Sequence, residues 1–320
     1  MFKLKRHAQN PILTPKKEHS WESRSVYNPA AVLKKDKVYL LYRATGKDEI
    51  DSIPISRLGL CVLKNDGLTI EKRYDSPVYE PKSWYEPAGC EDPRVTKIED
   101  SYYMLYTAYW GKRVPALYKG EEVNIAMAKT KDFLHWQRHG LILPGVSESE
   151  KNGALFPRKI NGLYALYYRV YPDIWVAYSE SLKEPLWRKR KMVASPRKGY
   201  FDEYKIGLGS PPIETKDGWL LIYHGVDKDP SEYPKQFQYR VGAMLVDKEN
   251  PEKVLYRSQE PILGPIEEYE KEGEVPRVVF PCGAVVIKGT LFVYYGGADT
   301  VVGIASCKLS ELLKELRRKK

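Results

Sequence analysis

Short runs of aromatic and aliphatic residues recur along the chain, and each run follows a polar turn. Five of these runs share a tyrosine at one place: Tyr39 to Arg43, Tyr102 to Thr107, Tyr164 to Arg169, Trp219 to His224 and Leu291 to Gly296. Their aromatic and β-branched content is typical of strands. When Tyr42, Tyr106, Tyr168, Tyr223 and Tyr295 are aligned, the steps between them are 64, 62, 55 and 72 residues. The chain is therefore interpreted as five copies of one unit.

Each unit predicts the same succession of strands. The turns before the aromatic runs, such as Glu99-Asp100-Ser101 and Asn161-Gly162, contain residues that favour hairpins. A proline is expected to open the strand before each turn, at Asn28-Pro29, Asp92-Pro93, Phe156-Pro157, Ser210-Pro211 and Phe280-Pro281. A third strand rich in small residues follows at Leu58 to Cys61, Asn124 to Met127, Trp175 to Tyr178, Val241 to Met244 and Val302 to Ala305. A further aromatic segment after several of these gives about four strands per unit.

Five four-stranded units predict an all-β fold, a five-bladed β-propeller whose sheets stand radially around a central channel. A sandwich or two separate β-domains would not need the same order of proline, hairpin and small residues five times. The chain is read as a single domain over residues 1–320, with the active site in the channel. One short C-terminal helix is expected from Leu309 to Arg318, with Leu312, Leu313 and Leu316 on one side, packing on the outside.

Composition supports this class and narrows the partners. The chain has 25 tyrosines and 7 tryptophans, and its four cysteines are widely separated, which favours neither a zinc site nor a disulfide framework. The net charge is +10, but basic and acidic residues are interleaved, so a nucleic-acid partner is not expected. No segment has the length of a signal peptide or a membrane span, and a cytoplasmic protein is expected.

Positions at which the units differ are where function can be placed. The residue after the aligned tyrosine is Arg43, Thr107, Arg169, His224 or Gly296, and the residue before the proline is Asn28, Asp92, Phe156, Ser210 or Phe280. Only the second unit offers an acid at the latter position. If these positions face the channel, Asp92 lies in a ring with Arg43, Arg169 and His224. Further polar residues flank the strand entrances, namely Lys151, Asn152, Lys205 and Asp299.

The stretch Gly89-Cys90-Glu91-Asp92-Pro93-Arg94 places two carboxylates next to each other before an aromatic strand. Neighbouring side chains of an extended chain point to opposite faces. One of Glu91 and Asp92 is therefore expected to face a cavity, while the other braces the backbone or a substrate hydroxyl. A solvated acidic turn is the ordinary alternative.

One carboxylic acid beside several cations suits inverting glycoside cleavage. The acid protonates the leaving oxygen, and a nucleophile attacks from the other side of the sugar. Water as the nucleophile requires a second carboxylate as base, for which Asp202, Glu203 and Asp227 are candidates. Inorganic phosphate is already anionic and requires cations instead. Each of these residues singly also has an ordinary structural explanation, and a non-catalytic propeller that binds glycans or proteins stays open.

These motifs resemble glycoside hydrolase family 130, the five-bladed propeller enzymes dominated by phosphorylases of β-mannosides. The resemblance covers essentially the whole chain and depends most on two motifs, Glu91-Asp92-Pro93-Arg94 and Tyr295-Gly296-Gly297-Ala298-Asp299. It implies an inverting phosphorylase that gives α-mannose 1-phosphate, with phosphate as a co-substrate and no metal or organic cofactor. An inverting β-mannosidase is the alternative within the family.

The resemblance also implies roles for single residues. Asp92 would be the general acid, passing its proton through the mannose 3-hydroxyl to the glycosidic oxygen. The mannosyl unit would be held by Asn28, Arg43, Lys205 and Asp299, and phosphate by Asn152, Arg169, His224 and Tyr239. Lys151, at a position where arginine is frequent in the family, keeps the positive charge there but loses the bidentate fork.

The linkage, the acceptor sugar and the chain length are left open. They depend on loops at the channel mouth, for which the sequence offers Thr45 to Pro54, Tyr109 to Glu122 and Asp227 to Gln238. The oligomeric state is open as well, and a loop exchanged between subunits of a homo-oligomer is one way to complete the acceptor site.

Overall fold

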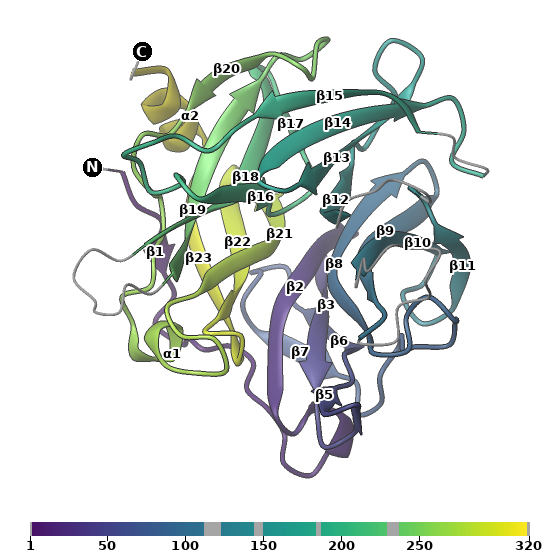
Figure 1. Cartoon of the computed structure of the whole chain (residues 1–320). Coiled ribbons are helices and arrows are strands. Elements are labelled where there is room, and N and C mark those ends of the chain that lie inside the picture. The colour runs from purple at the N-terminus through teal and green to yellow at the C-terminus, as the bar shows by residue number, and fades with distance from the viewer. Residues whose placement is uncertain (1, 112–122, 144–149, 184–186, 229–236, 319–320) are drawn as a thin grey trace.

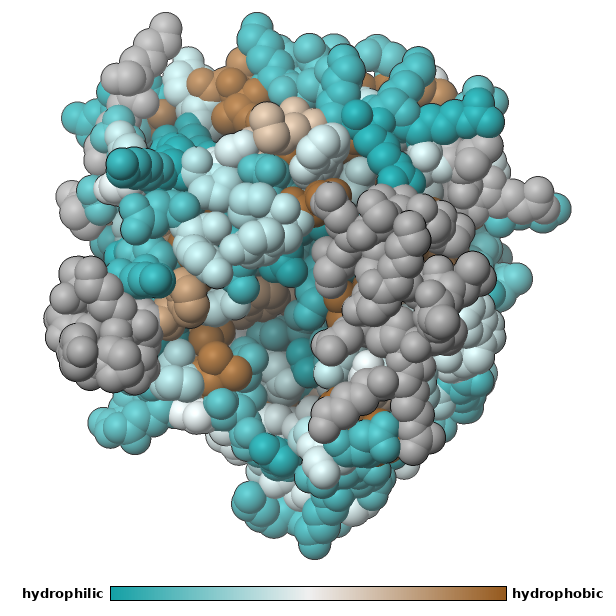
Figure 2. All heavy atoms as spheres, viewed as in Figure 1, coloured by the Kyte–Doolittle hydropathy of each residue, from teal (hydrophilic) through white to brown (hydrophobic). Residues whose placement is uncertain are grey.

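The computed structural model describes residues 2–111, 123–143, 150–183, 187–228 and 237–318. Within them the strands form five sheets arranged in a ring, so the predicted five-bladed β-propeller is confirmed (Figure 1). The innermost strands β2, β8, β12, β16 and β21 surround the centre of the view in Figure 1. In the same orientation the surface is predominantly hydrophilic, with scattered hydrophobic residues (Figure 2).

The five blades are antiparallel sheets, described here from the channel outward. The first contains β2 (Ser25–Lys34), β3 (Lys37–Thr45), β6 (Arg57–Leu63) and β7 (Ile70–Arg73). The second contains β8 (Gly89–Ile98), β9 (Ser101–Tyr109), β10 (Val123–Thr130) and β11 (Trp136–Leu141). The third contains β12 (Glu150–Leu155), β13 (Tyr164–Val170), β14 (Asp173–Ser179) and β15 (Arg188–Ala194). The fourth contains β16 (Lys205–Leu208), β17 (Ile213–Thr215), β18 (Gly218–Lys228), β19 (Phe237–Val246) and β20 (Val254–Arg257).

The fifth blade joins the two ends of the chain. It contains β21 (Val279–Ile287), β22 (Thr290–Gly297) and β23 (Val301–Lys308), and its outermost strand is β1 (Lys5–Arg6) from the N-terminal segment. Lys5 pairs with Ser306 and Arg6 with Ala305. The N-terminal strand therefore closes the ring. Because β1 is only two residues long, the sequence pattern did not predict this pairing.

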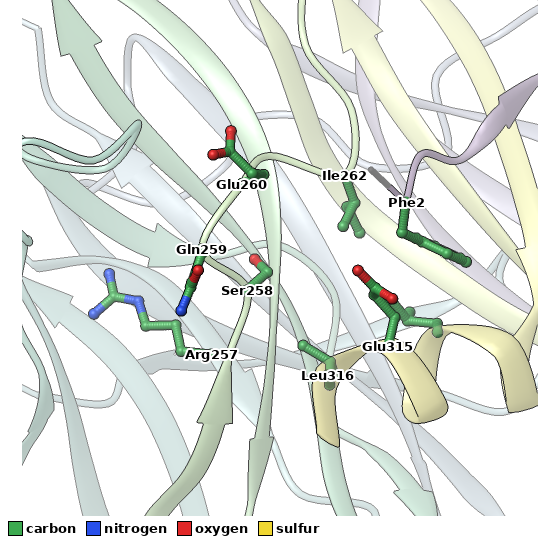
Figure 3. Close-up of a pocket in the computed structure, with 9 residues that line it drawn as sticks. Phe2, Arg257, Ser258, Gln259, Glu260, Ile262, Glu315 and Leu316 are labelled. Carbon is green, nitrogen blue, oxygen red and sulfur yellow. The ribbon is translucent and has the colours of Figure 1, made fainter. Parts of the chain in front are cut away.

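Four short elements and one helix complete the structure. The short elements are η1 (Ser20–Glu22), the hairpin of β4 (Glu49–Ile50) and β5 (Ile53–Pro54), and α1 (Glu268–Lys271). The predicted C-terminal helix is confirmed as α2 (Leu309–Arg318), which buries Leu312, Leu313 and Leu316 against the fourth and fifth blades. A small cavity beside α2 is lined by Phe2, the segment after β20 and the helix, and it holds none of the predicted site residues (Figure 3).

The aligned tyrosines explain the small residues of the third strands. Tyr42 pairs with Gly59, Tyr223 with Gly242 and Tyr295 with Gly303. A Cβ atom on any of these glycines would lie 2.3–2.5 Å from an atom of the tyrosine ring beside it. Each ring therefore lies across its neighbouring strand at a place where only a hydrogen atom fits.

The hydroxyl of each of four aligned tyrosines donates a hydrogen bond to a fully buried carboxylate. The pairs are Tyr42 with Glu22 (2.8 Å), Tyr106 with Glu86 (2.5 Å), Tyr223 with Asp202 (2.7 Å) and Tyr295 with Glu270 (2.8 Å). The carboxylates are paired in turn with arginines of the outermost strands, Arg73, Arg138, Arg257 and Arg6. In the third blade, buried Glu150 lies 3.7 Å from Arg190 of β15. Buried charges are stable only when paired and hydrogen-bonded, and this repeated cluster meets that requirement.

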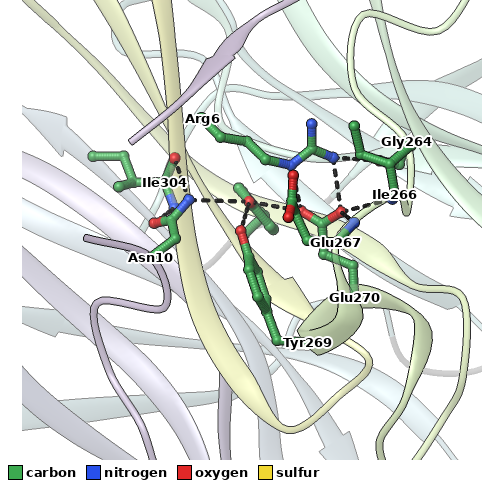
Figure 4. Close-up of polar contacts among 9 residues, drawn as sticks. Arg6, Asn10, Gly264, Ile266, Glu267, Tyr269, Glu270 and Ile304 are labelled. Atoms are coloured by element: carbon green, nitrogen blue, oxygen red, sulfur yellow. Dashed lines mark hydrogen bonds and ion pairs between the residues drawn. The ribbon is translucent and has the colours of Figure 1, made fainter. Parts of the chain in front are cut away.

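Figure 4 shows the cluster of the fifth blade. Arg6 donates to both carboxylate oxygens of Glu270, at 2.8 and 2.7 Å, and Tyr295 donates to the same carboxylate. Asn10 ties the N-terminal segment to the backbone of Ile304 at 2.9 Å. The ring closure is thus held by a buried ion pair as well as by the short strand β1.

Candidate active site

The predicted site residues meet in one cavity of about 200 Å³ in the channel. Ten of the eleven line it, namely Asn28, Arg43, Glu91, Asp92, Lys151, Asn152, Arg169, Lys205, Tyr239 and Asp299, together with Val275, Val278 and Phe280. The eleventh, His224, is completely buried, and its ring lies 4.4 Å from that of Phe280 and 6.0 Å from that of Tyr239. All five blades contribute to this set.

A β-bulge in the innermost strand presents the polar residue in three of the blades. The pairing register shifts between Tyr27 and Ala30, between Glu91 and Arg94, and between Lys151 and Ala154. The residue inside each bulge has a left-handed backbone, with φ of 47° at Asn28, 48° at Asp92 and 58° at Asn152. Asn and Asp tolerate this region better than other non-glycine residues, and bulges re-aim side chains next to active sites.

This register corrects the sequence alignment in two ways. The prolines do not open the innermost strands: Pro29 and Pro93 lie within them at the bulge, where a missing N–H is tolerated. In the third blade the strand ends at Leu155, before Phe156. The residue equivalent to Asn28 and Asp92 is therefore Asn152 and not Phe156. In the fourth blade the prolines separate β16 from β17, and Ser210 does not line the cavity.

The bulge also changes the expectation for the two adjacent acids. Because the left-handed turn at Asp92 interrupts the strand's alternation, both Glu91 and Asp92 line the cavity. Glu91 nonetheless braces a neighbour, since its carboxylate accepts from Nη2 of Arg43 at 2.5 Å and from Oγ of Ser56 at 3.3 Å. The expectation that only one of the two acids would face the cavity was therefore wrong.

Asp92 has hydrogen-bond donors from two directions. Its Oδ1 accepts from Nδ2 of Asn28 at 2.9 Å and lies 3.3 Å from Nη1 of Arg43. Burial alone would raise the pKa of this carboxyl, but Arg43, Arg94 and the hydrogen bond from Asn28 outweigh burial and lower it. Asp92 is thus a carboxylate at neutral pH, and a proton must reach it before it can act as an acid.

Arg94 is a functional neighbour that the sequence reasoning did not single out. It is buried beneath the cavity and donates to the carbonyl of Asp92 at 2.9 Å, of Leu208 at 2.8 Å and of Gly209 at 2.7 Å. The guanidinium therefore joins the second blade to the fourth and places a fixed positive charge under Asp92. The Glu-Asp-Pro-Arg motif contained it, but nothing in the motif showed where it points.

Cations from the third and fourth blades gather in the same cavity as Asp92. Lys151 and Arg169 are direct partners across β12 and β13, and Nζ of Lys205 lies 5.0 Å from the ring centre of Tyr239. Burial, followed by repulsion from Arg169 and Lys151, lowers the pKa of Lys205 to about 8. Burial likewise lowers the pKa of Lys151 and of Arg169, with the neighbouring cations contributing. Such a cluster of desolvated cations is stabilised by an anion, and phosphate fits that requirement.

His224 belongs to the wall behind these cations. Burial and then Arg169, Arg94 and Lys205 lower its pKa well below the usual value, so the imidazole is neutral at physiological pH. Gly207 pairs with His224 across β16 and β18. A Cβ atom there would lie 2.5 Å from Oδ1 of Asn152 and 2.8 Å from Nε2 of His224. The glycine thus lets these two side chains approach each other.

Asp299 faces the same cavity from the fifth blade. It follows β22 with a left-handed φ of 50°. Its pKa is raised to about 7, mainly by burial, and the charge of Arg43 lowers it while Asp92 and Glu91 raise it. Asp299 is therefore the carboxyl of the cavity whose protonation changes near neutral pH.

The remaining acids proposed for a hydrolytic base lie elsewhere. Asp202 is buried against Tyr223 and Arg257, Glu203 accepts from the backbone of Gly199, and Asp227 pairs with Arg240. None of the three lines the cavity. Of the three loops expected at the channel mouth, residues 112–122 and 229–236 lie outside the described residues, and Thr45 to Pro54 contains the β4–β5 hairpin.

Within residues 2–111, 123–143, 150–183, 187–228 and 237–318, no group of three or more His, Cys, Asp and Glu side chains is placed to hold a metal ion. No helix in those ranges is long and apolar enough to cross a membrane.

Comparison with known proteins gives consistent matches along the chain. The family model Glyco_hydro_130, described as beta-1,4-mannooligosaccharide phosphorylase, matches residues 3–318. The chain is 43% identical over 314 residues to a 1,2-beta-oligomannan phosphorylase of Thermoanaerobacter sp. (strain X514), covering 98% of this chain and 99% of that one.

Two solved structures share the fold over nearly the whole chain. The structure of the Listeria innocua beta-1,2-mannobiose phosphorylase with beta-1,2-mannobiose superposes with a TM-score of 0.83 at 28% identity, covering 99% of both chains. A second structure, described as a member of the GH130 family containing glycoside hydrolases that target beta-1,2 mannosidic linkages in Candida mannan, gives 0.84 at 28% identity, covering 97% of this chain and 95% of that one.

Proposed function

The chain belongs to glycoside hydrolase family 130, as its motifs predicted, and from this premise we propose that it cleaves a β-linked mannoside with inorganic phosphate. The products are α-mannose 1-phosphate and an acceptor shortened by one mannosyl unit. One observation supports this most directly: Asp92 and the cations Lys151, Arg169 and Lys205 line a single cavity. The linkage we propose is β-1,2, following the relative that is 43% identical to this chain.

The chemistry follows from this combination of an acid and cations in one cavity. The mannosyl unit lies between Asp92 and the cation cluster, with Asn28, Arg43, Lys205 and Asp299 holding its hydroxyls. Phosphate bound by Lys151, Asn152, Arg169, His224 and Tyr239 attacks the anomeric carbon. As the carbon–oxygen bond to the leaving sugar breaks, its electron pair goes to the glycosidic oxygen, which receives the proton of Asp92. Attack from the face opposite the leaving group inverts the configuration.

The proton is balanced by phosphate itself. Hydrogen phosphate brings one proton, and the mannose 1-phosphate product leaves as a dianion without it. That proton restores Asp92, while the first has left on the acceptor. Because Asp92 is ionised in the empty cavity, binding of an anion beside Lys151 and Arg43 also favours its protonation. No metal or organic cofactor takes part in this scheme.

The neutral imidazole of His224 suits this assignment. A neutral ring can donate one hydrogen bond to a phosphate oxygen without adding another charge to an already crowded cationic cluster. Lys151 contributes a point charge in place of a bidentate fork, so phosphate is held mainly by Arg169, with the charge of Lys205 beside it.

The direct test measures products with and without phosphate. Purified protein is incubated with β-1,2-mannobiose and β-1,4-mannobiose, and mannose 1-phosphate and free mannose are quantified by ion chromatography. Phosphate-dependent formation of mannose 1-phosphate, equal in amount to the shortened acceptor, is expected. Equal release of free mannose in both conditions would identify a hydrolase, as in the Candida mannan enzymes of similar structure.

A binding protein without turnover is distinguished by one variant. If the protein only binds glycans, the Asp92→Asn variant should keep its affinity for the disaccharide. Neither the wild type nor the variant should then show turnover. In the proposed enzyme the same substitution leaves binding and removes phosphorolysis.

A further inference from the structure

The three bulges that present polar residues to the cavity differ at one position. Strand pairing resumes two residues after the bulged residue, at Ala30 in the first blade, Arg94 in the second and Ala154 in the third. All three of these residues are buried. Because two of the bulges form with an alanine at this position, the bulge itself does not require an arginine. The arginine accompanies the one bulge that carries an acid, Asp92.

The guanidinium of Arg94 is bonded to backbone carbonyls. Within the part of the chain that the structure describes, Nη1 donates to Asp92 at 2.9 Å, Nε to Gly209 at 2.7 Å and Nη2 to Leu208 at 2.8 Å. Each of these partners is a carbonyl oxygen and none is a carboxylate. A buried cation that has no carboxylate partner is costly to the fold. This cost, at a position where alanine suffices in two other blades, indicates a role in function.

The three carbonyls belong to two segments that both carry cavity residues. Asp92 lines the cavity from the second blade, and its left-handed backbone is held by the bond from Arg94 to its own carbonyl. Leu208 is the last residue of β16, which begins with Lys205, another residue of the cavity wall. Gly209 follows directly and is 115 residues from Arg94 in sequence. Arg94 therefore fixes the bulge of the acid relative to the strand of a cation.

We propose that Arg94 is a positioning residue of the reaction, which ties the bulge of Asp92 to β16 across the channel and supplies a fixed positive charge beneath the carboxyl. The inference rests on the proposed function, in which Asp92 protonates the leaving sugar while phosphate beside Lys205 attacks. A misplacement of about 1 Å between reacting groups can cost about 10²-fold in rate. Arg94 is buried and does not line the cavity, so it acts through these residues and not on a substrate.

The kinetic test separates the fork of Arg94 from its charge. Arg94→Met removes both and is expected to lower kcat about 10²-fold, with KM for phosphate and for the mannoside within about 3-fold of the wild type. Arg94→Lys keeps the charge without the planar fork and is expected to lose about 10-fold in kcat. Arg73→Met is the matched control. Arg73 is also largely buried and bonded to Glu22 and Tyr42, but it lies in β7 at the outside of the first blade, so kcat per folded molecule should not change.

A pH profile adds a measurement that a purely structural role would not change. In the synthetic direction, from mannose 1-phosphate and an acceptor sugar, Asp92 accepts a hydroxyl proton, so synthesis is lost as pH falls through its pKa. Burial raises this pKa, while Arg43 and then Arg94 lower it. The loss of synthesis is therefore expected at higher pH in Arg94→Met, and at the wild-type pH in Arg94→Lys. Ionisation of mannose 1-phosphate affects all three proteins equally, and the other polar groups of the cavity near Asp92 are unchanged, namely Asn28, Glu91, Lys151 and Asp299.

Three results would overturn the positioning role. They are a kcat of folded Arg94→Met within about 3-fold of the wild type, an equal loss of kcat in Arg73→Met, and a fall in kcat without movement of the low-pH loss of synthesis. If circular dichroism shows Arg94→Met unfolded, Arg94→Lys decides, and a wild-type kcat in that variant would overturn the role. A wild type that releases free mannose in place of mannose 1-phosphate would overturn only phosphorolysis. The same fall in kcat, measured from free mannose, would then still support the role of Arg94.

Discussion

The side-chain amide of Asn28 donates a hydrogen bond of 2.9 Å to Oδ1 of Asp92, and each residue reaches the other from the left-handed position of its own bulge in a neighbouring blade. The bond favours the charged form of Asp92, as do Arg43 and Arg94. Asp92 is therefore held as a carboxylate, and in the proposed mechanism phosphate bound to the nearby cations favours its protonation.

Replacement of Asp92 tests its role as the proton donor. Asp92→Asn keeps the size of the side chain but cannot supply the proton, so kcat for phosphorolysis is expected to fall by about 10²- to 10⁴-fold. Mannose 1-phosphate formation measures the loss. Asp36→Asn, at an exposed turn of the first blade, should leave kcat unchanged. An Asp92→Asn enzyme that keeps its rate within a few-fold would remove Asp92 from the chemistry.

The pH dependence of phosphate use follows from Lys205. Its pKa in the empty site is lowered to about 8, so below that value the ammonium is charged and attracts phosphate, and above it the charge is lost. KM for phosphate is therefore expected to rise as pH increases beyond about 8, a range in which phosphate itself stays a dianion. Steady-state kinetics at saturating mannoside measures this alkaline rise in KM for phosphate.

Lys205→Arg provides the control for that profile. The guanidinium stays charged throughout the range, so the alkaline rise in the phosphate KM should disappear. If KM for phosphate rises equally above pH 8 in the wild type and in Lys205→Arg, another group titrates and Lys205 does not cause the rise.

The blades and their order could be predicted from local signals. Period-two aromatic runs, hairpin residues and the aligned tyrosines lie close together in sequence, so they indicated five units and the C-terminal helix. The family motifs likewise pointed to ten residues that now line one cavity. The third-blade residue equivalent to Asp92 was assigned wrongly as Phe156. The alignment followed the prolines, whereas the equivalent position is set by the bulge that contains Asn152.

Other features depend on contacts that no local pattern encodes. The ring closure by β1 rests on two residues and a pairing almost the whole chain away. Arg94 was visible, but its direction is set by carbonyls of Leu208 and Gly209 in a distant blade. A usable signal was present for the buried carboxylates, since Glu22 and Glu86 each precede their tyrosine by 20 residues.

The repeated buried cluster predicts where stability is concentrated. Glu86 accepts from Tyr106 and pairs with Arg138 at 3.1 Å inside the second blade. Glu86→Ala leaves the half-buried Arg138 without its carboxylate partner and the buried hydroxyl of Tyr106 without its acceptor, and a loss of about 3 kcal/mol in the free energy of unfolding is expected. Tyr106→Phe removes two hydrogen bonds, the one it donates to Glu86 and the one it accepts from Tyr79, and should cost about 1–3 kcal/mol.

Urea denaturation followed by tryptophan fluorescence measures both losses. Glu71→Gln is the control, because its ion pair with Lys37 is at the surface, and its unfolding midpoint should not move. Equal midpoints for Glu71→Gln and Glu86→Ala would show that the buried cluster contributes no more than a surface pair.

Two glycines offer a matched pair that separates the phosphate side of the site from the mannosyl side. A Cβ atom on Gly207 would lie 2.5 Å from Oδ1 of Asn152, whereas one on Gly296 would lie 2.1 Å from Oδ1 of Asn28. Gly207→Ala should therefore displace Asn152 and His224 and raise KM for phosphate about 10-fold or more, with little change in KM for the mannoside. Gly296→Ala should do the reverse, because Asn28 holds Asp92 and faces the sugar.

Both substitutions add one methyl group against an asparagine side chain, with His224 also in contact at Gly207, and circular dichroism should show both variants folded. The split between the two KM values then reports which substrate each amide serves. If both variants raise both KM values to the same extent, Asn28 and Asn152 do not serve separate substrates, and the assignment of the cavity into a mannosyl side and a phosphate side fails.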